Sequence, residues 1–509
     1  MKKSLLAGLG FAACALAHAG APSLPSPHVA WLPAAADADV DRAFSQARAE
    51  KKPVLLYWGA TWCPPCNRLK ATLFNRQDFV AQSRSFVAVH VDGDRPGAQK
   101  LGARFKVSAY PTMVLFSPDG AEITRLPGAA EPERVMGVLQ TGLAGGRPMK
   151  AVLADARAGK SITINEWRLL AFYSWELDEA QLVPEAQRPA LLAELAAKAP
   201  GAEGEAATRL WLKALSSGGL KSEAAAWTRF NKLLSDPVLV RIHLDAVVDD
   251  ATELAQALSA DDDPRRAPLI AAYDAALAKL QGDAALSRAD RIGALISRVN
   301  LGRLGQGADT LQPKLPAALV AEARDVSARM DREISDGYER QAVITAAGYL
   351  LGRAGLWAES DTLLKANLTK SHSPYYLMSQ LGSNARKQGR PDEALRWYEQ
   401  AFDKSEGPAT RLQWGAGYLN ALVDLAPADA PRIEKAAAQL IGEAALDPGA
   451  FSMRSARALQ RLGKKLVGWN ADGQQAAVLQ RLQARLDPVC AKVEAAERAA
   501  CQGLLKKAS

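Results

Sequence analysis

Two spacings of hydrophobic residues run along this chain. In its first third, short apolar runs at 54–58, 86–91, 113–116 and 123–126 predict strands that are bounded by turn-forming or charged residues. Between the runs, apolar residues recur every three or four positions and predict helices, at 39–51, 67–74, 79–83, 98–105 and 131–143. Strands that alternate with helices and end in a hairpin predict a mixed α/β sheet covered by helices. Residues 36–145 are long enough for one such domain.

The rest of the chain, 146–509, keeps the helical spacing without a clear strand pattern. Gly145-Gly146-Arg147-Pro148 predicts a boundary, and alanine- and leucine-rich segments such as 164–176 and 188–198 then follow one another. The whole chain has 509 residues, which is too long for a single core. The sequence therefore predicts a larger all-α domain after the α/β domain.

Part of this helical region repeats itself. Two glycine-led segments, 355–360 and 389–394, lie 34 residues apart, and Gly348 and Gly382 keep the same spacing. The pattern resembles tetratricopeptide repeats, in which stacked helix pairs form a solenoid, and it is clearest at about 341–425. The resemblance implies a protein ligand on the concave face. A packed helical domain without repeats is the alternative.

The stretch Trp62-Cys63-Pro64-Pro65-Cys66 carries the candidate chemistry. It joins a predicted strand to a predicted helix, so the first sulfur lies at a helix N-terminus, where unpaired N–H groups favour a thiolate. A thiolate attacks disulfides, and the second sulfur lies close enough to release the resulting mixed disulfide. The motif therefore predicts a redox-active dithiol at Cys63 and Cys66.

Two other functions of this cysteine pair stay open. A zinc site would need two further ligands, but the next cysteines are Cys490 and Cys501, and the histidines show no ligand spacing. A purely structural disulfide is the second alternative. We expect no metal and no cofactor, since no nucleotide or flavin motif is present.

The N-terminus predicts export. Lys2 and Lys3 precede an apolar run, and Ala17-His18-Ala19 supplies a cleavage site between small residues. Residues 1–19 are therefore expected to be a secretory signal peptide, and the proline-rich segment 20–35 an unfolded leader. The predicted location is the periplasm.

Lipid attachment at Cys14 is an alternative to this cleavage, because Ala12-Ala13-Cys14 partly resembles a lipoprotein cleavage box. The net charge of +8 is mild over such a length. Basic residues do not cluster with aromatic ones, so nucleic acid is not an expected partner.

An exported protein with four remaining cysteines favours disulfide pairing. Cys490 and Cys501 lie in a segment that is predicted to be helical, 489–505. On one straight helix they would be roughly 16 Å apart, which is too far for a disulfide. We expect a structural bridge with a helix break between them, near 494–498, while a second redox pair or two buried thiols stay open.

Residues 36–145 resemble the thioredoxin superfamily. Three features carry this resemblance: the WCPPC motif, Tyr110-Pro111-Thr112 before a strand, and Gly128 after the hairpin. Within the superfamily the segment is similar to secreted thioredoxins related to the C-terminal domain of the periplasmic disulfide-interchange reductase. It covers about a fifth of the chain.

The resemblance implies roles for single residues. Cys63 would be the exposed nucleophile and Cys66 the buried resolving thiol. Pro111 would follow a cis peptide bond and pack against the disulfide, while the Tyr110 backbone binds an extended substrate and Trp62 shields the sulfurs.

The sequence departs from the family pattern at two positions. Tyr57 stands where many thioredoxins have a buried aspartate that relays protons to the resolving thiol, and Gly59 stands where an aromatic residue is common. The usual acid–base assistance is therefore missing, and Tyr57 is expected to be a core residue.

The resemblance implies a periplasmic thiol–disulfide oxidoreductase. It would reduce disulfides of exported proteins and receive electrons from a membrane thiol reductase. A disulfide oxidase or isomerase is one alternative. A helical-repeat adaptor for envelope proteins, with the thioredoxin domain as a docking module, is the other.

Overall fold

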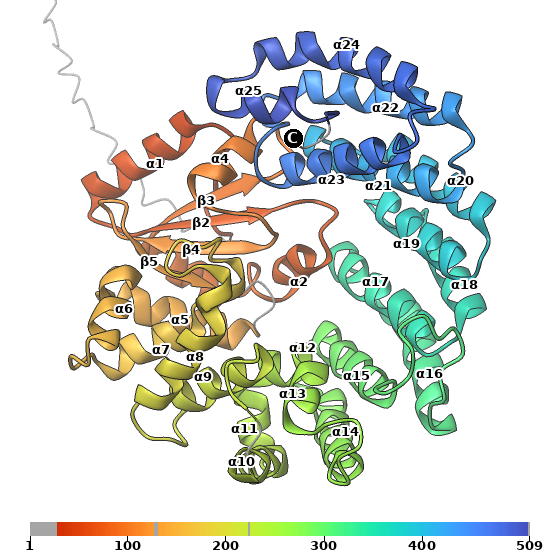
Figure 1. Cartoon of the computed structure of the whole chain (residues 1–509). Coiled ribbons are helices and arrows are strands. Elements are labelled where there is room, and N and C mark those ends of the chain that lie inside the picture. Colours follow the sequence, from red (N-terminus) through yellow and green to blue (C-terminus); the bar gives the residue numbers. More distant parts are fainter. Residues whose placement is uncertain (1–27, 127–130, 222–223, 507–509) are drawn as a thin grey trace, which may run out of the picture.

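The computed structural model describes residues 28–126, 131–221 and 224–506 (Figure 1). It begins with a mixed five-stranded sheet in the order β1-β3-β2-β4-β5. The strands are β1 Leu32–Ala34, β2 Val54–Gly59, β3 Val87–Asp92, β4 Thr112–Phe116 and β5 Glu122–Leu126. Strands β1 and β2 pair parallel with β3, whereas β4 pairs antiparallel with both β2 and β5.

Helices cover both faces of this sheet. They are α1 Asp37–Glu50, α2 Pro64–Thr72, α3 Gln77–Gln82, α4 Ala98–Arg104 and α5 Pro132–Leu143. Alternate residues of β2 serve the two cores: Leu56 packs with side chains of α1 and α4, and Leu55 packs with side chains of α2 and α5. Residues 32–143, named the α/β region below, therefore form the predicted mixed sheet covered by helices.

Strand β1 corrects one expectation. Residues 20–35 were expected to form an unfolded leader, but Leu32–Ala34 pairs with 89–91 of β3 as an edge strand. Prolines are tolerated on such an edge. The predicted signal peptide 1–19, Cys14 and Gly128 lie outside the described residues.

Residues 149–506, named the helical region below, contain helices only, apart from turns and short 3-10 segments, in the part of the chain that the structure describes. These helices are α6 Met149–Arg157, α7 Ile164–Phe172, α8 Arg188–Lys198, α9 Glu205–Ser216, α10 Ala224–Ser235, α11 Pro237–Ile242, α12 Leu244–Asp249, α13 Ala251–Leu258, α14 Arg266–Gly282, α15 Arg288–Gly302, α16 Ala317–Glu333, α17 Gly337–Arg353, α18 Trp357–Asn367, α19 Pro374–Lys387, α20 Pro391–Lys404, α21 Pro408–Leu425, α22 Ala430–Leu446, α23 Met453–Trp469, α24 Ala476–Lys492 and α25 Ala495–Gln502. None of these described helices is long and apolar enough to cross a membrane.

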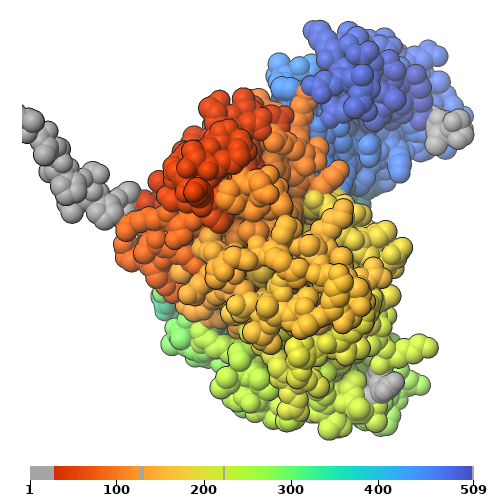
Figure 2. Space-filling model, turned by 90° about the vertical axis from the view of Figure 1, so that its left-hand side faces the viewer, coloured from red at the N-terminus to blue at the C-terminus, as the bar shows by residue number. Residues whose placement is uncertain are grey.

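The helical region curves around the α/β region in an arc (Figure 1). Seen from the side, its first helices lie below the α/β region and its last helices lie above it (Figure 2). Ion pairs join the two along the arc, including Arg241 with Glu131 at 2.7 Å, Arg68 with Asp290, and Lys100 with Glu494. The inner side of the arc is therefore occupied by the α/β region of the same chain.

The spacing of 34 residues has a structural counterpart. Gly348 of α17 lies so close to α18 that an added Cβ would be 2.7 Å from Leu364. Gly382 of α19 lies similarly close to α20, where an added Cβ would be 2.9 Å from Tyr398. Gly355 and Gly389, in the turns that follow α17 and α19, both have positive φ, at 82° and 69°. The glycine pattern thus marks two consecutive helix pairs that pack in the same way.

A disulfide joins Cys490 and Cys501, whose Cα atoms are 5.5 Å apart. Helix α24 ends at Lys492 and α25 begins at Ala495, so the chain reverses between the two cysteines. Both sulfur-bearing residues are fully buried among side chains of α22, α23 and α24. The bridge closes the C-terminal end of the helical region.

Removing this bridge with Cys490→Ser/Cys501→Ser is expected to destabilise α24 and α25 by about 3 kcal/mol, the entropy of closing a short loop. Amide hydrogen exchange of the two helices should become about 100-fold faster, because each 1.4 kcal/mol is a factor of ten. The amides of α14, in a separate hydrophobic cluster, serve as the internal control. Unchanged exchange in α25 would contradict the stabilising role of the bridge.

Candidate functional site

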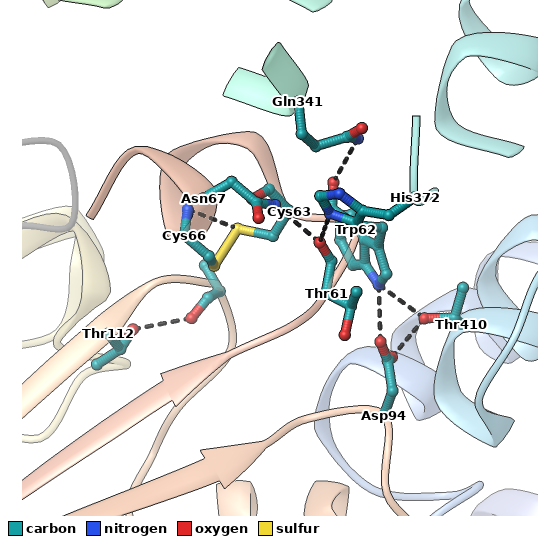
Figure 3. The surroundings of a disulfide bond; sticks show 11 residues. Thr61, Trp62, Cys63, Cys66, Asn67, Asp94, Thr112, Gln341, His372 and Thr410 are labelled. Atoms are coloured by element: carbon teal, nitrogen blue, oxygen red, sulfur yellow. Dashed lines mark hydrogen bonds between the residues drawn. A yellow bond between two sulfur atoms is a disulfide. The ribbon is translucent and has the colours of Figure 1, made fainter. Parts of the chain in front are cut away.

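The two cysteines of the WCPPC motif lie at the turn between β2 and α2 (Figure 3). Cys63 is the N-cap residue of α2, and its sulfur accepts a hydrogen bond from the backbone N–H of Cys66 at 3.2 Å. A disulfide joins the two residues, with their Cα atoms 5.2 Å apart. Pro64 and Pro65 form the first helical positions, where no backbone donor is needed.

This placement favours thiol chemistry at Cys63. The unpaired N–H groups at the start of a helix stabilise a thiolate more than a neutral thiol. Asn67 is fully buried and holds the turn in shape, since its side-chain amide donates to the carbonyl oxygens of Thr61 at 2.7 Å and Cys63 at 2.9 Å. Cys66 is 0% exposed, so the prediction that it is buried is confirmed.

The segment before β4 lies beside this turn. Thr112 pairs with Trp58, so the start of β4 is next to the end of β2. The Tyr110–Pro111 peptide bond is cis, and Pro111 is buried. The ring of Tyr110 packs against the hydrophobic cluster that contains both cysteines.

Tyr57 and Gly59, the two departures from the family pattern, depend on one another. The Tyr57 ring is 2% exposed, packs against Phe74 and His90, and its hydroxyl has no hydrogen-bond partner among the described residues. Burial raises the pKa of this hydroxyl well above its usual range, so it does not exchange protons at neutral pH. An added Cβ at position 59 would lie 2.5 Å from the hydroxyl oxygen. A tyrosine at 57 therefore requires a glycine at 59.

We expect Gly59→Ala to lower the free energy of unfolding by about 1–3 kcal/mol, because the new methyl group overlaps the Tyr57 ring. Urea denaturation of the full-length chain, monitored by hydrogen exchange of the β2 amides, measures this loss of stability. Gly442→Ala in α22 is the matched control, since an added Cβ there meets nothing within 4 Å. Equal stabilities for the two variants would contradict the dependence of position 59 on Tyr57.

The helical region covers the cysteine turn. Cys63 is 2% exposed and Trp62 is 8% exposed, so the expectation that Cys63 is exposed is wrong in this form of the chain. The reason is that helices α17, α19 and α21 lie against the turn and bury it. Tyr375 and Met378 of α19 belong to the same buried cluster as Cys63 and Cys66.

Polar contacts align these helices with the turn (Figure 3). The Gln341 side chain donates to the Trp62 carbonyl oxygen at 3.1 Å, and the His372 ring lies 3.1 Å from the Thr61 carbonyl oxygen. The Trp62 indole N–H lies 2.7 Å from the Thr410 hydroxyl and 2.9 Å from the Asp94 carboxylate. The helical region therefore contacts the carbonyl oxygens of Thr61 and Trp62 and the Trp62 indole N–H.

Asp94 follows β3 and lies at the centre of this contact. Burial raises its pKa from 3.8 to about 7, and the nearby Asp92 carboxylate adds to the rise. Hydrogen bonds from Thr410 and Trp62 and the charge of Arg454 oppose it. The carboxyl group is therefore partly protonated near neutral pH.

Asp94, Gln341, His372 and Thr410 were not predicted from the sequence. They are polar residues of common types, and the contacts they make join positions up to 348 residues apart. Nothing in the local pattern around them indicates a site. By contrast, the predicted residues lie together where the central strand β2 ends and its neighbour β4 begins: Trp62, Cys63, Cys66, Tyr110 and Pro111.

The described residues contain no cluster of three or more His, Cys, Asp or Glu side chains that could hold a metal ion.

Comparisons with known proteins point to the same segment. A model of the thioredoxin-like domain matches residues 40–143. The thiol:disulfide interchange protein DsbD 2 of Pseudomonas aeruginosa is 31% identical over 110 residues, which are 21% of this chain and 19% of that protein. The chain thus spans about a fifth of the length of this relative.

Two smaller relatives are matched over most of their length. The thioredoxin of Mycolicibacterium smegmatis is 35% identical over 79 residues, 15% of this chain and 67% of that protein. Thioredoxin H5 of Arabidopsis thaliana is 36% identical over 87 residues, 17% of this chain and 69% of that protein. Through the domain that carries Cys63 and Cys66, this chain belongs to the thioredoxin family.

Proposed function

We propose that the chain is a periplasmic thiol–disulfide oxidoreductase that reduces disulfides of exported proteins through Cys63 and Cys66. The observation that carries this proposal is the cysteine pair at the N-terminus of α2, with Cys63 as N-cap and Cys66 fully buried. The similarity to DsbD 2, a thiol:disulfide interchange protein, supports an exchange function. The apolar run and cleavage site at 1–19 support the periplasmic location.

In this proposal the reduced pair acts in two steps. The Cys63 thiolate attacks one sulfur of the substrate disulfide, forms a mixed disulfide and releases the other substrate sulfur as a thiolate. The Cys66 thiolate then attacks the Cys63 sulfur, which releases the second substrate thiolate and forms the Cys63–Cys66 disulfide. Two electrons pass to the substrate, and its thiolates take protons from water. The structure has the pair in the oxidised form that results.

A dithiol donor must then reduce the Cys63–Cys66 disulfide. We propose a membrane thiol reductase for this step, and the Tyr110 backbone and Trp62 as the surface that receives an extended substrate segment. The pair itself needs no bound cofactor for either step.

The test uses the reduced full-length chain and a denatured protein that contains disulfides. For each Cys63–Cys66 disulfide that forms, two thiols should appear on the substrate. Alkylation followed by mass spectrometry counts both. Absence of this transfer at every pH from 5 to 8, both in the unchanged chain and in Thr410→Val, which weakens the contact over Trp62, would overturn the proposal.

The adaptor hypothesis gains support from one observation, the burial of the cysteine turn under the helical region. Replacing both cysteines, Cys63→Ser/Cys66→Ser, separates the two functions. An adaptor would keep its cellular function in this variant, whereas the proposed oxidoreductase would lose it.

A further inference from the structure

The redox site of this chain is closed by the chain itself. Helices α17, α19 and α21, together with His372 in the turn before α19, are named the lid below. The lid contributes Gln341, His372 and Thr410 to hydrogen bonds with the Thr61–Trp62 segment. It also places the aromatic rings of Tyr376 and Trp414 against the Trp62 indole, at centroid distances of 6.0 and 4.9 Å.

The geometry leaves no room for a substrate in this form. Disulfide exchange requires an incoming sulfur to approach the Cys63 sulfur, and the mixed disulfide must hold a second polypeptide beside it. Cys63 is 2% exposed and shares its buried surroundings with Tyr375 and Met378 of the lid. The lid thus occupies the place that an extended substrate segment would take next to Trp62 and Tyr110.

Contacts between the α/β region and the helices next to the lid also stabilise the closed form on both sides of it. On one side, the Arg68 guanidinium of α2 pairs with Asp290 of α15. On the other side, the Arg454 backbone N–H donates to the Gln99 side chain at 3.2 Å, and the Arg454 guanidinium lies 5.1 Å from the Trp62 ring centroid. Polar, charged and aromatic contacts on every side of the cysteine turn indicate a specific interface between the α/β region and the helical region.

We propose that the lid gates the redox site, so that the Cys63–Cys66 pair exchanges with other molecules only after the lid has moved off the Trp62–Cys63 turn. This inference rests on the proposed function, because it explains when the dithiol can act. The surface that the lid covers is the one a protein disulfide would need. A partner that binds the released aromatic face of the lid would therefore switch the oxidoreductase on.

The test follows reduction of the Cys63–Cys66 disulfide in the full-length chain by the phosphine TCEP at fixed pH. The phosphine is oxidised to its oxide with water as oxygen source, and the two sulfurs become thiols. Alkylation followed by peptide mass mapping distinguishes this pair from Cys490 and Cys501. Gating predicts a rate that rises with TCEP concentration and then reaches a plateau set by lid opening.

Two lid variants sharpen the test. Thr410→Val removes the hydroxyl that meets Trp62 at nearly constant volume, and His372→Ala removes the ring beside Thr61. His372→Ala is expected to raise the reduction rate at low TCEP about tenfold, the effect of one lost hydrogen bond. Thr410→Val should raise it at least as much, because the Thr410 hydroxyl also donates a hydrogen bond to Asp94. Thr362→Val is the matched control. Among the described residues the exposed Thr362 hydroxyl bonds only to the Ala358 carbonyl oxygen within α18, so the variant should be reduced at the rate of the original chain.

The gating proposal would be overturned by a reduction rate that stays proportional to TCEP concentration and is equal in the original chain and in all three variants. The plateau of the original chain keeps the test decisive if a variant folds poorly. The readout needs no protein substrate, so it separates the two proposals. Gated reduction without transfer to any protein disulfide, even in Thr410→Val, would leave the lid standing and overturn the proposed function.

Discussion

Cys63→Ser is expected to abolish disulfide exchange by the full-length chain, with a loss on the order of 10³-fold or more in the rate of substrate reduction. A serine hydroxyl at the N-terminus of α2 stays protonated near neutral pH and forms no mixed disulfide. Alkylation of newly formed substrate thiols measures the rate.

The partner variant, Cys66→Ser, should behave differently. The Cys63 thiolate can still attack the substrate, but the resolving sulfur is missing, so a mixed disulfide between Cys63 and substrate should accumulate. Intact mass spectrometry under non-reducing conditions detects this adduct.

Cys490→Ser/Cys501→Ser is the control for both variants. That bridge lies in the hydrophobic cluster of α22, α23 and α24, so its removal should lower stability and leave exchange intact. Equal exchange rates for Cys63→Ser and the unchanged chain would show that the WCPPC pair is structural.

The second large effect concerns pH. Burial in the closed structure raises the pKa of Asp94 from the ordinary 3.8 to about 7. We expect the ordinary value to return once the lid has opened and water reaches the carboxyl group. Between these two pKa values the carboxyl group is ionised in the open form but must bind a proton to be buried in the closed form. A rise in pH over this range therefore shifts the equilibrium toward the open form. The closed form is therefore most favoured below about pH 4. It becomes less favoured as the pH rises to about 7, and the equilibrium changes no further above that pH.

The full range of this linkage is on the order of 10³-fold in the ratio of open to closed chains, since each pKa unit contributes a factor of ten. Divided by the rate of Asp94→Asn at the same pH, which cancels the protonation of the phosphine, reduction of Cys63–Cys66 by low TCEP should become faster from pH 5 to pH 7 and then level off. The charged and titratable groups that face Asp94 are Asp92, Arg454, Tyr110 and Tyr375.

Asp94→Asn removes the charge at nearly the same shape, so its reduction rate at each pH should stay low and should follow only the protonation of the phosphine itself. Asp119→Asn is the control, because that carboxylate lies in the β4–β5 turn and bonds only to Ser117 in the described structure. A steep pH dependence that survives in Asp94→Asn would assign the effect to another group.

The α/β region was largely predictable from local pattern. The WCPPC motif fixes a strand-to-helix turn, and the apolar runs give β2, β3 and β4 within one residue of their observed ends. Strand β1 was missed because three residues with a proline at their centre carry no periodicity of their own. They form a strand only through pairing with β3, which follows more than fifty residues later.

Helix ends were less predictable where tertiary contacts decide them. The predicted helix at 164–176 ends at Phe172, since Tyr173 turns extended and its hydroxyl bonds Asp178 at 2.6 Å. The break between Cys490 and Cys501 was expected because one straight helix holds them too far apart, and the structure places it at 493–494.

The lid lay beyond sequence reasoning. The inner side of the helical arc, where the sequence predicts a protein ligand, packs against the chain's own α/β region (Figure 1). Gln341 and Thr410 are ordinary helix residues, and only the curvature of many packed helices brings them to Trp62. Such curvature sums small rotations at each helix pair and cannot be read from one pair.

The most direct test of the central claim is the equilibrium potential of the Cys63–Cys66 pair in glutathione buffers, with incubation long enough for lid opening. Differential alkylation reports the fraction reduced, with Cys490 and Cys501 followed as the structural reference. A redox-active reductase should titrate near about −270 mV, the value of thioredoxin. A pair that stays oxidised below about −300 mV, like a structural disulfide, would contradict the account, and a value near about −120 mV would reverse the proposed direction.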